Sequence, residues 1–260
     1  MKTNLYSLDG KVVKQIDLPK VFETEYRDDL IKRAVLSDES RTFQPKGNYK
    51  YAGMETSAKY RGRKEMYGAI KNKGIAHLPH EVQPKGNFGK VKRVPQAVKG
   101  RRAHPPKPET KLVEEMNHKE YLKALGVAIG SSTNKNLVKF RCSVDFESLP
   151  IVLDNSFEKL KKTKEVVSVF DALKCTKWMN GTKEKKSVSA LIVVSGGSIL
   201  KAAANISGVD VVSVPKLTVK HFAPGTKAGR LVLYTESALK QVEDRIEDKP
   251  VAKPAKKVKA

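Results

Sequence analysis

Cysteine and long apolar runs are both scarce in this sequence of 260 residues. Its two cysteines, Cys142 and Cys175, form no C-x-x-C pair and have no metal-ligand spacing. Isolated thiols of this kind are usually small core hydrophobes in a reducing compartment. No stretch reaches the roughly 18 apolar residues that a membrane span requires, and the first thirty residues lack the pattern of a secretory signal. We therefore expect a cytosolic protein without structural disulfides.

Acidic residues are few relative to basic ones. The chain has 51 Lys and Arg against 28 Asp and Glu, which leaves a formal net charge of +23. A surplus of this size indicates a polyanionic partner, because the summed field attracts phosphate and repels other cations. Nucleic acid is the first candidate. An anionic membrane surface is the weaker alternative, since no long basic amphipathic helix is evident.

The positive charge is concentrated in two segments. Residues 44–111 carry 17 Lys and Arg against four Glu, a net charge of +13, and residues 249–260 carry five Lys and no acidic residue. The rest of the chain holds the last +5, which is ordinary for a soluble domain. The basicity is therefore a property of these segments rather than of the whole protein.

Residues 44–111 also differ in composition. They include eight Gly and seven Pro but only eight Leu, Ile, Val or Phe, all from Ile70 onward. So few apolar groups cannot offset the conformational entropy of folding 68 residues into a separate core. The cations are interleaved with aromatic side chains that can stack on unpaired bases, namely Tyr49, Tyr51, Tyr60, Tyr67 and Phe88. We interpret the segment as a long extended arm that is ordered by RNA; the alternative is a disordered basic segment that binds RNA nonspecifically.

Regular elements are expected on both sides of the arm. Short apolar runs around a turn predict a hairpin over Leu5–Leu18, and acidic residues followed by an apolar stripe predict a helix over Arg27–Thr42. Beyond the arm, Asn117 and Glu120 have the spacing of a capping box. They predict the start of a helix that ends near Ser131.

The C-terminal half alternates strand and helix patterns. The expected elements are a strand at Ile151–Leu153, a basic helical stretch through Leu173, a strand at Ala190–Ser195, a helix at Ser198–Ile206, strands at Val209–Val212 and Leu231–Tyr234, and a helix at Glu236–Ile246. This alternation predicts an α/β body with a mainly parallel sheet. We assign residues 1–43 and 112–248 to the body, residues 44–111 to the arm and residues 249–260 to a disordered Lys-rich tail.

Motifs for catalysis or metal binding are incomplete. A phosphate-binding loop would lie at Ser195–Ser198, between a strand and a helix, but neither dinucleotide nor P-loop glycine spacing is present. A tight turn and a helix cap explain these residues without a ligand. His77 and His80 are spaced H-x-x-H, but Pro79 lies between them and no further ligands accompany them. We expect no metal, no cofactor and no catalytic residue.

Three sequence runs closely resemble one protein family. They are Arg93-Val-Pro-Gln-Ala-Val-Lys-Gly-Arg-Arg-Ala-His-Pro-Pro-Lys107, Ala52-Gly-Met-Glu-Thr-Ser-Ala58, and Ala223-Pro-Gly-Thr-Lys-Ala-Gly-Arg-Leu-Val-Leu-Tyr-Thr-Glu-Ser-Ala-Leu239. The family is large-subunit ribosomal protein four in its archaeal and eukaryotic branch. The first run is fifteen residues long and unusual in composition, and the resemblance covers nearly the whole chain except the Lys-rich tail.

The resemblance implies a three-layer α/β/α body at the surface of the large ribosomal subunit and an arm that threads through large-subunit rRNA. In this family the arm tip helps to line the polypeptide exit tunnel beside universal protein twenty-two of the large subunit. Here the tip would lie near Tyr60 to His80. Many relatives carry a Gly-x-Gly-Arg-Gly-like run at this point, whereas this chain reads Lys59-Tyr-Arg-Gly-Arg-Lys-Glu-Met-Tyr67. Which tip residue faces the tunnel therefore stays open.

The arm supplies all the candidate RNA-binding residues. Arginine can contact phosphate or base edges with two parallel hydrogen bonds, whereas lysine acts more as a point charge. The predicted rRNA-binding residues are Lys46, Lys50, Tyr51, Lys59, Tyr60, Arg61, Arg63, Lys64, Lys71, Lys73, His77, Lys90, Lys92, Arg93, Lys99, Arg101, Arg102, His104 and Lys107.

Two alternative functions remain. A basic RNA-binding protein or chaperone outside the ribosome would associate with RNA transiently and without fixed stoichiometry. A nucleic-acid-modifying enzyme would need a ligand pocket near Gly196. The prediction from the sequence is nonetheless a structural protein of the large ribosomal subunit, with no small-molecule substrate and no membrane partner.

Overall fold

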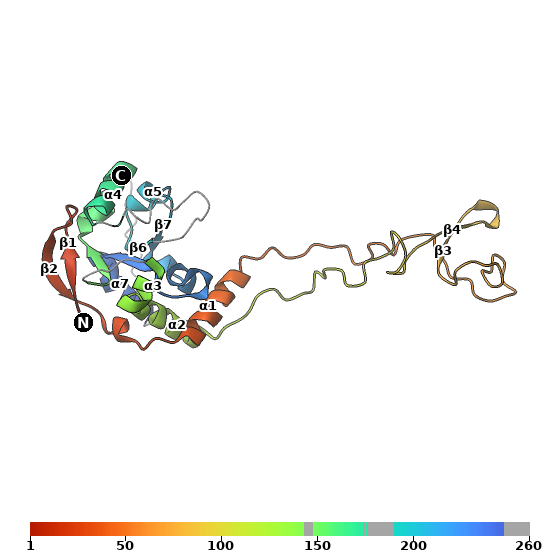
Figure 1. The fold of residues 1–260 in the computed structure, drawn as a ribbon, viewed down its shortest axis with the longest axis horizontal. Helices are drawn as coiled ribbons and strands as arrows, with labels where there is room; N and C mark the ends of the chain where they lie inside the picture. Colours follow the sequence, from red (N-terminus) through yellow and green to blue (C-terminus); the bar gives the residue numbers. More distant parts are fainter. Residues whose placement is uncertain (143–147, 174, 176–189, 247–260) are drawn as a thin grey trace, which may run out of the picture. The chain divides into compact units, whose positions relative to one another are not determined.

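The computed structural model describes residues 1–142, 148–173, 175 and 190–246 (Figure 1). It divides into two compact units. The body comprises residues 1–42 and the described part of 113–260, and the arm unit comprises residues 43–112. The Lys-rich tail at 249–260 lies outside the described residues. Within the described residues, no helix is both long and apolar enough to cross a membrane.

The body contains a six-stranded sheet in the order β2-β1-β5-β8-β6-β7. Its strands are β1 (Lys2–Tyr6), β2 (Val12–Asp17), β5 (Ile151–Leu153), β6 (Ala190–Val194), β7 (Val209–Ser213) and β8 (Leu231–Thr235). Only β1 and β2 pair antiparallel, as the hairpin that the sequence predicts; the other pairings are parallel. The helices of the body are α1 (Asp28–Ser40), α2 (His118–Ser131), α3 (Lys135–Cys142), α4 (Thr163–Ala172), α5 (Ile199–Ala202), α6 (Val219–Phe222) and α7 (Glu236–Ile246).

Two hydrophobic clusters cover opposite faces of this sheet. Because successive strand residues point to opposite faces, Leu191 and Val193 of β6 join the cluster formed with α1, α2, α6 and α7. Ala190, Ile192 and Val194 join the cluster formed with α4 and α5. The predicted three-layer α/β/α body with a mainly parallel sheet is therefore confirmed.

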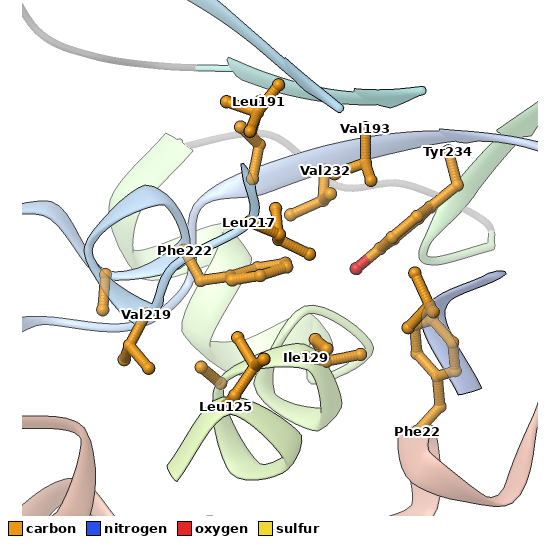
Figure 2. Close-up of a cluster of buried hydrophobic side chains, with 14 of the residues drawn as sticks. Phe22, Leu125, Ile129, Leu191, Val193, Leu217, Val219, Phe222, Val232 and Tyr234 are labelled. Atoms are coloured by element: carbon orange, nitrogen blue, oxygen red, sulfur yellow. The ribbon is translucent and has the colours of Figure 1, made fainter. Parts of the chain in front are cut away.

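The first cluster illustrates how the layers meet. Figure 2 shows Phe222 of α6 beside Leu217, with the strand side chain Val232 above them and Leu125 of α2 below. At its other end the rings of Phe22 and Tyr234 meet edge to face, with their centroids 5.5 Å apart. Among the described residues, all members of the two clusters belong to the body and none to the arm unit.

Most predicted elements of the body agree with the structure to within one or two residues, but four details differ. Asn117 precedes α2 without a side-chain cap, so the predicted capping box is wrong; Glu120 instead pairs with Arg33 of α1 at 2.8 Å. The helix expected at Ser198–Ile206 is shortened to α5, because the chain turns at Ala203–Gly208.

The other two differences are local. The helical stretch expected before Leu173 consists of a 3-10 turn at Asn155–Lys159 and the separate helix α4. Helices α3 and α6 were not predicted, because both are short. Cys175 is buried in the second cluster, as expected of a core thiol, whereas the side chain of Cys142 lies outside the described residues.

Candidate nucleic-acid interface

The arm unit consists of two legs, which we define as residues 43–57 and 93–112, and a tip, residues 58–92. In Figure 1 the legs run alongside one another toward the strands β3 and β4. They approach closely at Gly53, where an added Cβ would lie 3.0 Å from the Cα of Arg101. Glycine at this position therefore allows the two backbones to meet.

The legs line an open pocket of about 620 Å³ that contains several cations and one aromatic ring. Lys50, Arg101 and Arg102 line it together with Tyr49. The rings of Tyr49 and Tyr51 meet edge to face at 5.9 Å. Tyr49 also donates a hydrogen bond to Glu55, and this bond, with a smaller contribution from desolvation, raises the pKa of the Tyr49 phenol. The combination of guanidinium, ammonium and phenol groups suits phosphate and base contacts.

The tip contains a short antiparallel hairpin of β3 (His80–Val82) and β4 (Phe88–Val91). Its turn places Lys85 and Gly86 at positive φ, 60° and 75°. A left-handed backbone is unstrained for glycine but unfavourable for lysine. The isolated bridge between Lys59 and His80 adds a third backbone segment beside β3.

His80 is the buried polar centre of the tip. Only 7% of the residue is exposed. Its Nδ1 lies 3.0 Å from the carbonyl oxygen of Gly89, and its Nε2 lies 2.9 Å from that of Ala76. Both ring nitrogens therefore face backbone carbonyl oxygens, and the tautomer decides which nitrogen donates. With both nitrogens used in this way, His80 is poorly placed to bind a metal.

The loop before β3 closes on itself. Arg61 accepts a backbone hydrogen bond from Ile70 at 3.0 Å, and its guanidinium donates to the carbonyl of Tyr67 at 3.1 Å. Ala58, Ala69 and Ile70 are buried. The expectation that the arm has no core of its own is therefore wrong at the tip. A few small apolar groups and the His80 hydrogen bonds build a local core that composition alone does not reveal.

The nineteen predicted rRNA-binding residues all lie in the arm unit, distributed over the legs and the tip. Arg61, Lys92 and Arg101 are half-buried and the others are exposed. Some of these side chains also hold the arm together. Arg93 donates to the carbonyl of Ala58 at 3.2 Å, Lys92 lies 3.8 Å from Glu81, and the ammonium of Lys73 lies 5.2 Å from the ring centroid of Phe88.

A second cavity, of about 210 Å³, lies within the tip. Lys59, Arg61, Tyr67 and Phe88, all noted in the sequence, line it. Sequence reasoning did not select three further lining residues, Gln83, Lys85 and Asn87. The only signal for a turn here was Pro84-Lys-Gly86, a Pro/Gly run between the apolar residues Val82 and Phe88.

The tip is expected to exchange backbone amide hydrogens more slowly than the legs in the RNA-free protein. In the tip, long-range hydrogen bonds join Lys59 N to His80 O and Lys92 N to Pro79 O, both at 3.0 Å. In the legs the backbone bonds close local turns, such as that from Ala52 N to Tyr49 O. Hydrogen–deuterium exchange followed by mass spectrometry measures the difference, because amides that open readily exchange first.

A His80→Ala substitution provides the matched comparison for this experiment. It should speed exchange across 58–92 and leave body peptides such as those of β8 unchanged, since only the tip loses its buried hydrogen bonds. Exchange in the wild-type tip as fast as in the legs would contradict the presence of a local core.

The turn at Ser195–Ser198, between β6 and α5, is the place where a phosphate would bind, and a side chain of the body occupies it. The Glu158 carboxylate accepts hydrogen bonds from Ser195 N at 3.0 Å and from the Thr235 and Ser237 hydroxyls at 2.6 Å each. A Cβ at Gly197, where φ is +103°, would lie 2.5 Å from the Glu158 carbonyl oxygen. The chain's own carboxylate therefore takes the backbone N–H that an anion would require.

Ser198 does not cap α5, contrary to the expectation from sequence. Its hydroxyl instead lies within hydrogen-bond distance of the carbonyls of Glu158, Lys159 and Leu160, at 2.9 to 3.3 Å. These contacts hold the turn at Ser195–Ser198 against the 3-10 turn at Asn155–Lys159. Among the described residues, no group of three His, Cys, Asp or Glu side chains has an arrangement suited to a metal ion.

Comparison with known proteins identifies one family. The model of the ribosomal protein L4/L1 family matches residues 16–245. This range includes the whole arm unit and the described body except residues 1–15 and 246.

Similar proteins match the chain over almost its full length. The large ribosomal subunit protein uL4 of Methanocaldococcus jannaschii is 44% identical, over 95% of this chain and all of the relative. The protein of the same name from Methanoculleus marisnigri is 40% identical, over 94% of this chain and 99% of the relative. That of Methanococcus vannielii is 44% identical, over 94% of this chain and all of the relative.

Proposed function

The chain belongs to the ribosomal protein L4/L1 family, and from this premise we propose that it is a structural component of the large ribosomal subunit, in the cytoplasm, that binds large-subunit rRNA through its arm. The observation that carries the proposal is a separate unit of residues 43–112 that combines high positive charge with exposed aromatic rings. The role is structural rather than catalytic.

The charges of the arm supply affinity. Each Lys or Arg that neutralises a phosphate releases condensed counterions, so binding is strong at low salt. Arg63 and Arg102 are exposed, and each can make paired hydrogen bonds to a phosphate or to a guanine edge. These contacts account for binding to RNA in general.

The aromatic rings of the arm supply selectivity for unpaired nucleotides. Tyr49, Tyr51, Tyr60 and Tyr67 are between 51% and 79% exposed. A ring of this kind stacks on an unstacked base, whereas the bases of an RNA duplex are inaccessible to it. The arm is therefore suited to the single-stranded loops and junctions of a folded rRNA.

The partners of the body and of the tip follow from the family. Other proteins of the large subunit are expected neighbours. Within the tip, residues 60–80 are proposed to help line the polypeptide exit tunnel beside universal protein twenty-two. Incorporation of the arm during assembly would fix it among rRNA segments that later close around it.

Sedimentation of a native lysate through a sucrose gradient, before and after a high-salt wash, tests this function. We expect one copy of the protein per large subunit at both salt concentrations. Superficial phosphate contacts weaken steeply as salt rises, whereas an arm enclosed by rRNA is retained. A protein that is stripped by the wash or sediments mainly in light fractions would instead be a mobile RNA-binding protein or chaperone.

A further inference from the structure

We propose that the cavity at the arm tip is a binding site for one unpaired nucleotide of RNA, with its base against Tyr67 and its phosphate beside Lys85. This inference rests on the proposed function, since it takes RNA as the partner. It adds a specific subsite to an arm whose charges by themselves bind any RNA.

The lining of the cavity matches the parts of a nucleotide. Tyr67 and Phe88 supply aromatic surface for a base, and the side-chain amides of Gln83 and Asn87 can both donate and accept hydrogen bonds. Lys59 and Lys85 are available to a phosphate, and Arg61, which donates from Nη1 to the Tyr67 carbonyl, adds a third positive charge to the lining. A set with aromatic, amide and cationic groups together is typical of sites for single-stranded nucleic acid.

Tyr67 and Phe88 differ in how firmly they are held. Phe88 is half-buried, meets His80 at a centroid distance of 5.9 Å and carries Lys73 over its ring. It forms a fixed part of the lining. Tyr67 is 79% exposed, although its hydroxyl lies only 3.2 Å from where a Cβ at Gly86 would be. An exposed ring beside a glycine turn gains buried area only when a ligand covers it.

The backbone supports the same assignment. Lys85 is in the left-handed conformation, φ 60°, next to Gly86, which adopts a similar conformation without strain. Residues held in unfavourable conformations cluster at active sites, ligand clamps and switch regions, where the surrounding structure maintains them. Glu81 also lines the cavity; Lys92 lies 3.8 Å from its carboxylate and offsets its repulsion of a phosphate.

The first test uses the full-length protein and small probes. Saturation-transfer NMR should detect binding of the adenosine, guanosine, cytidine and uridine 5′-monophosphates, with base protons receiving the strongest transfer. Ribose 5-phosphate, which lacks the base, should bind about tenfold more weakly, as expected when stacking is lost. Equal affinity for ribose 5-phosphate and the nucleotides would overturn the proposal.

Two substitutions distinguish binding in this cavity from nonspecific attraction to the positive charge of the arm. Tyr67→Ala should weaken nucleotide binding about tenfold and leave ribose 5-phosphate unchanged. Lys85→Gly should weaken every phosphate probe roughly two- to tenfold, without loss of folding, because glycine relieves the left-handed strain. Met66→Ala, in an exposed neighbour of Tyr67 that does not line the cavity, is the control and should change neither affinity.

The second test distinguishes RNA from free nucleotide. In large subunits that carry Tyr67→Ala, dimethyl sulfate or carbodiimide should modify at least one rRNA base that is protected in the wild-type subunit. Monophosphate binding without any change in rRNA modification would overturn the assignment to RNA. A protein missing from large subunits altogether would refute the proposed function; a protein present there, with no effect of Tyr67→Ala in either test, would refute only this site.

Discussion

Deletion of residues 54–100 is expected to leave the body folded and to reduce incorporation into large subunits at least about tenfold. The deletion joins Gly53 to Arg101, whose backbones already lie in contact, so the new peptide bond requires little rearrangement. Both hydrophobic clusters of the body consist of residues outside the arm. The melting temperature of the body should therefore change by no more than about 2 °C.

A charge-matched linker is the control for this deletion. In it, a flexible Gly-Ser segment of the same length carries lysines at the positions of the deleted cations. It should restore binding to RNA in general but not incorporation, because it lacks the tip core and the aromatic rings. Normal incorporation with this linker would mean that the arm acts only as a polycation. Unfolding of the body on deletion would contradict the division into two independent units.

Truncation of Phe222, one of the largest fully buried side chains of the body, is expected to cost much of its stability. Phe222 is 1% exposed and packs among strand and helix side chains in the first cluster (Figure 2). Phe222→Ala should lower the free energy of unfolding by about 3–5 kcal/mol, because it removes apolar contacts and leaves a cavity. Urea unfolding followed by circular dichroism measures this change.

Phe140 on α3 provides a matched control, since the same substitution is made at a side chain that is 85% exposed. Phe140→Ala should change the free energy of unfolding by no more than about 0.5 kcal/mol. Similar losses at both positions would show that the cluster around Phe222 does not form the core of the body. Neither substitution touches the arm, so the nucleotide tests should give unchanged results.

Strands and helices could be predicted where the spacing of apolar residues along the chain indicates which side chains are buried. Residues 190–194 are apolar throughout and form a strand buried on both faces, and Glu236–Ile246 matches α7 residue for residue. Capping was not predictable in the same way. Glu120 has the spacing for a capping box, but its carboxylate instead forms an ion pair with Arg33 of the neighbouring helix α1. A local pattern cannot reveal a competitor that lies 87 residues away.

The candidate interface was likewise only partly predictable from the sequence. The position of the arm and its charge and aromatic residues were visible in composition, because a long segment poor in apolar groups stands out against the body. Lys85 and its neighbours Gln83 and Asn87 were not selected, since each is an ordinary polar residue in sequence. Only the hairpin turn brings them to the same cavity as Arg61 and Tyr67.

By itself, the sequence determined the class of the body, the boundaries of most of its elements and the basic character of the arm, because periodicity and charge are properties of consecutive residues. The tertiary structure alone decided which side chains share a site. It set Glu158 beside the turn at Ser195–Ser198 and buried His80 within the tip. Both positions depend on hydrogen bonds to backbone groups, that of Ser195 for Glu158 and those of Ala76 and Gly89 for His80. Backbone groups are the same in nearly every residue, so no sequence pattern predicts these bonds.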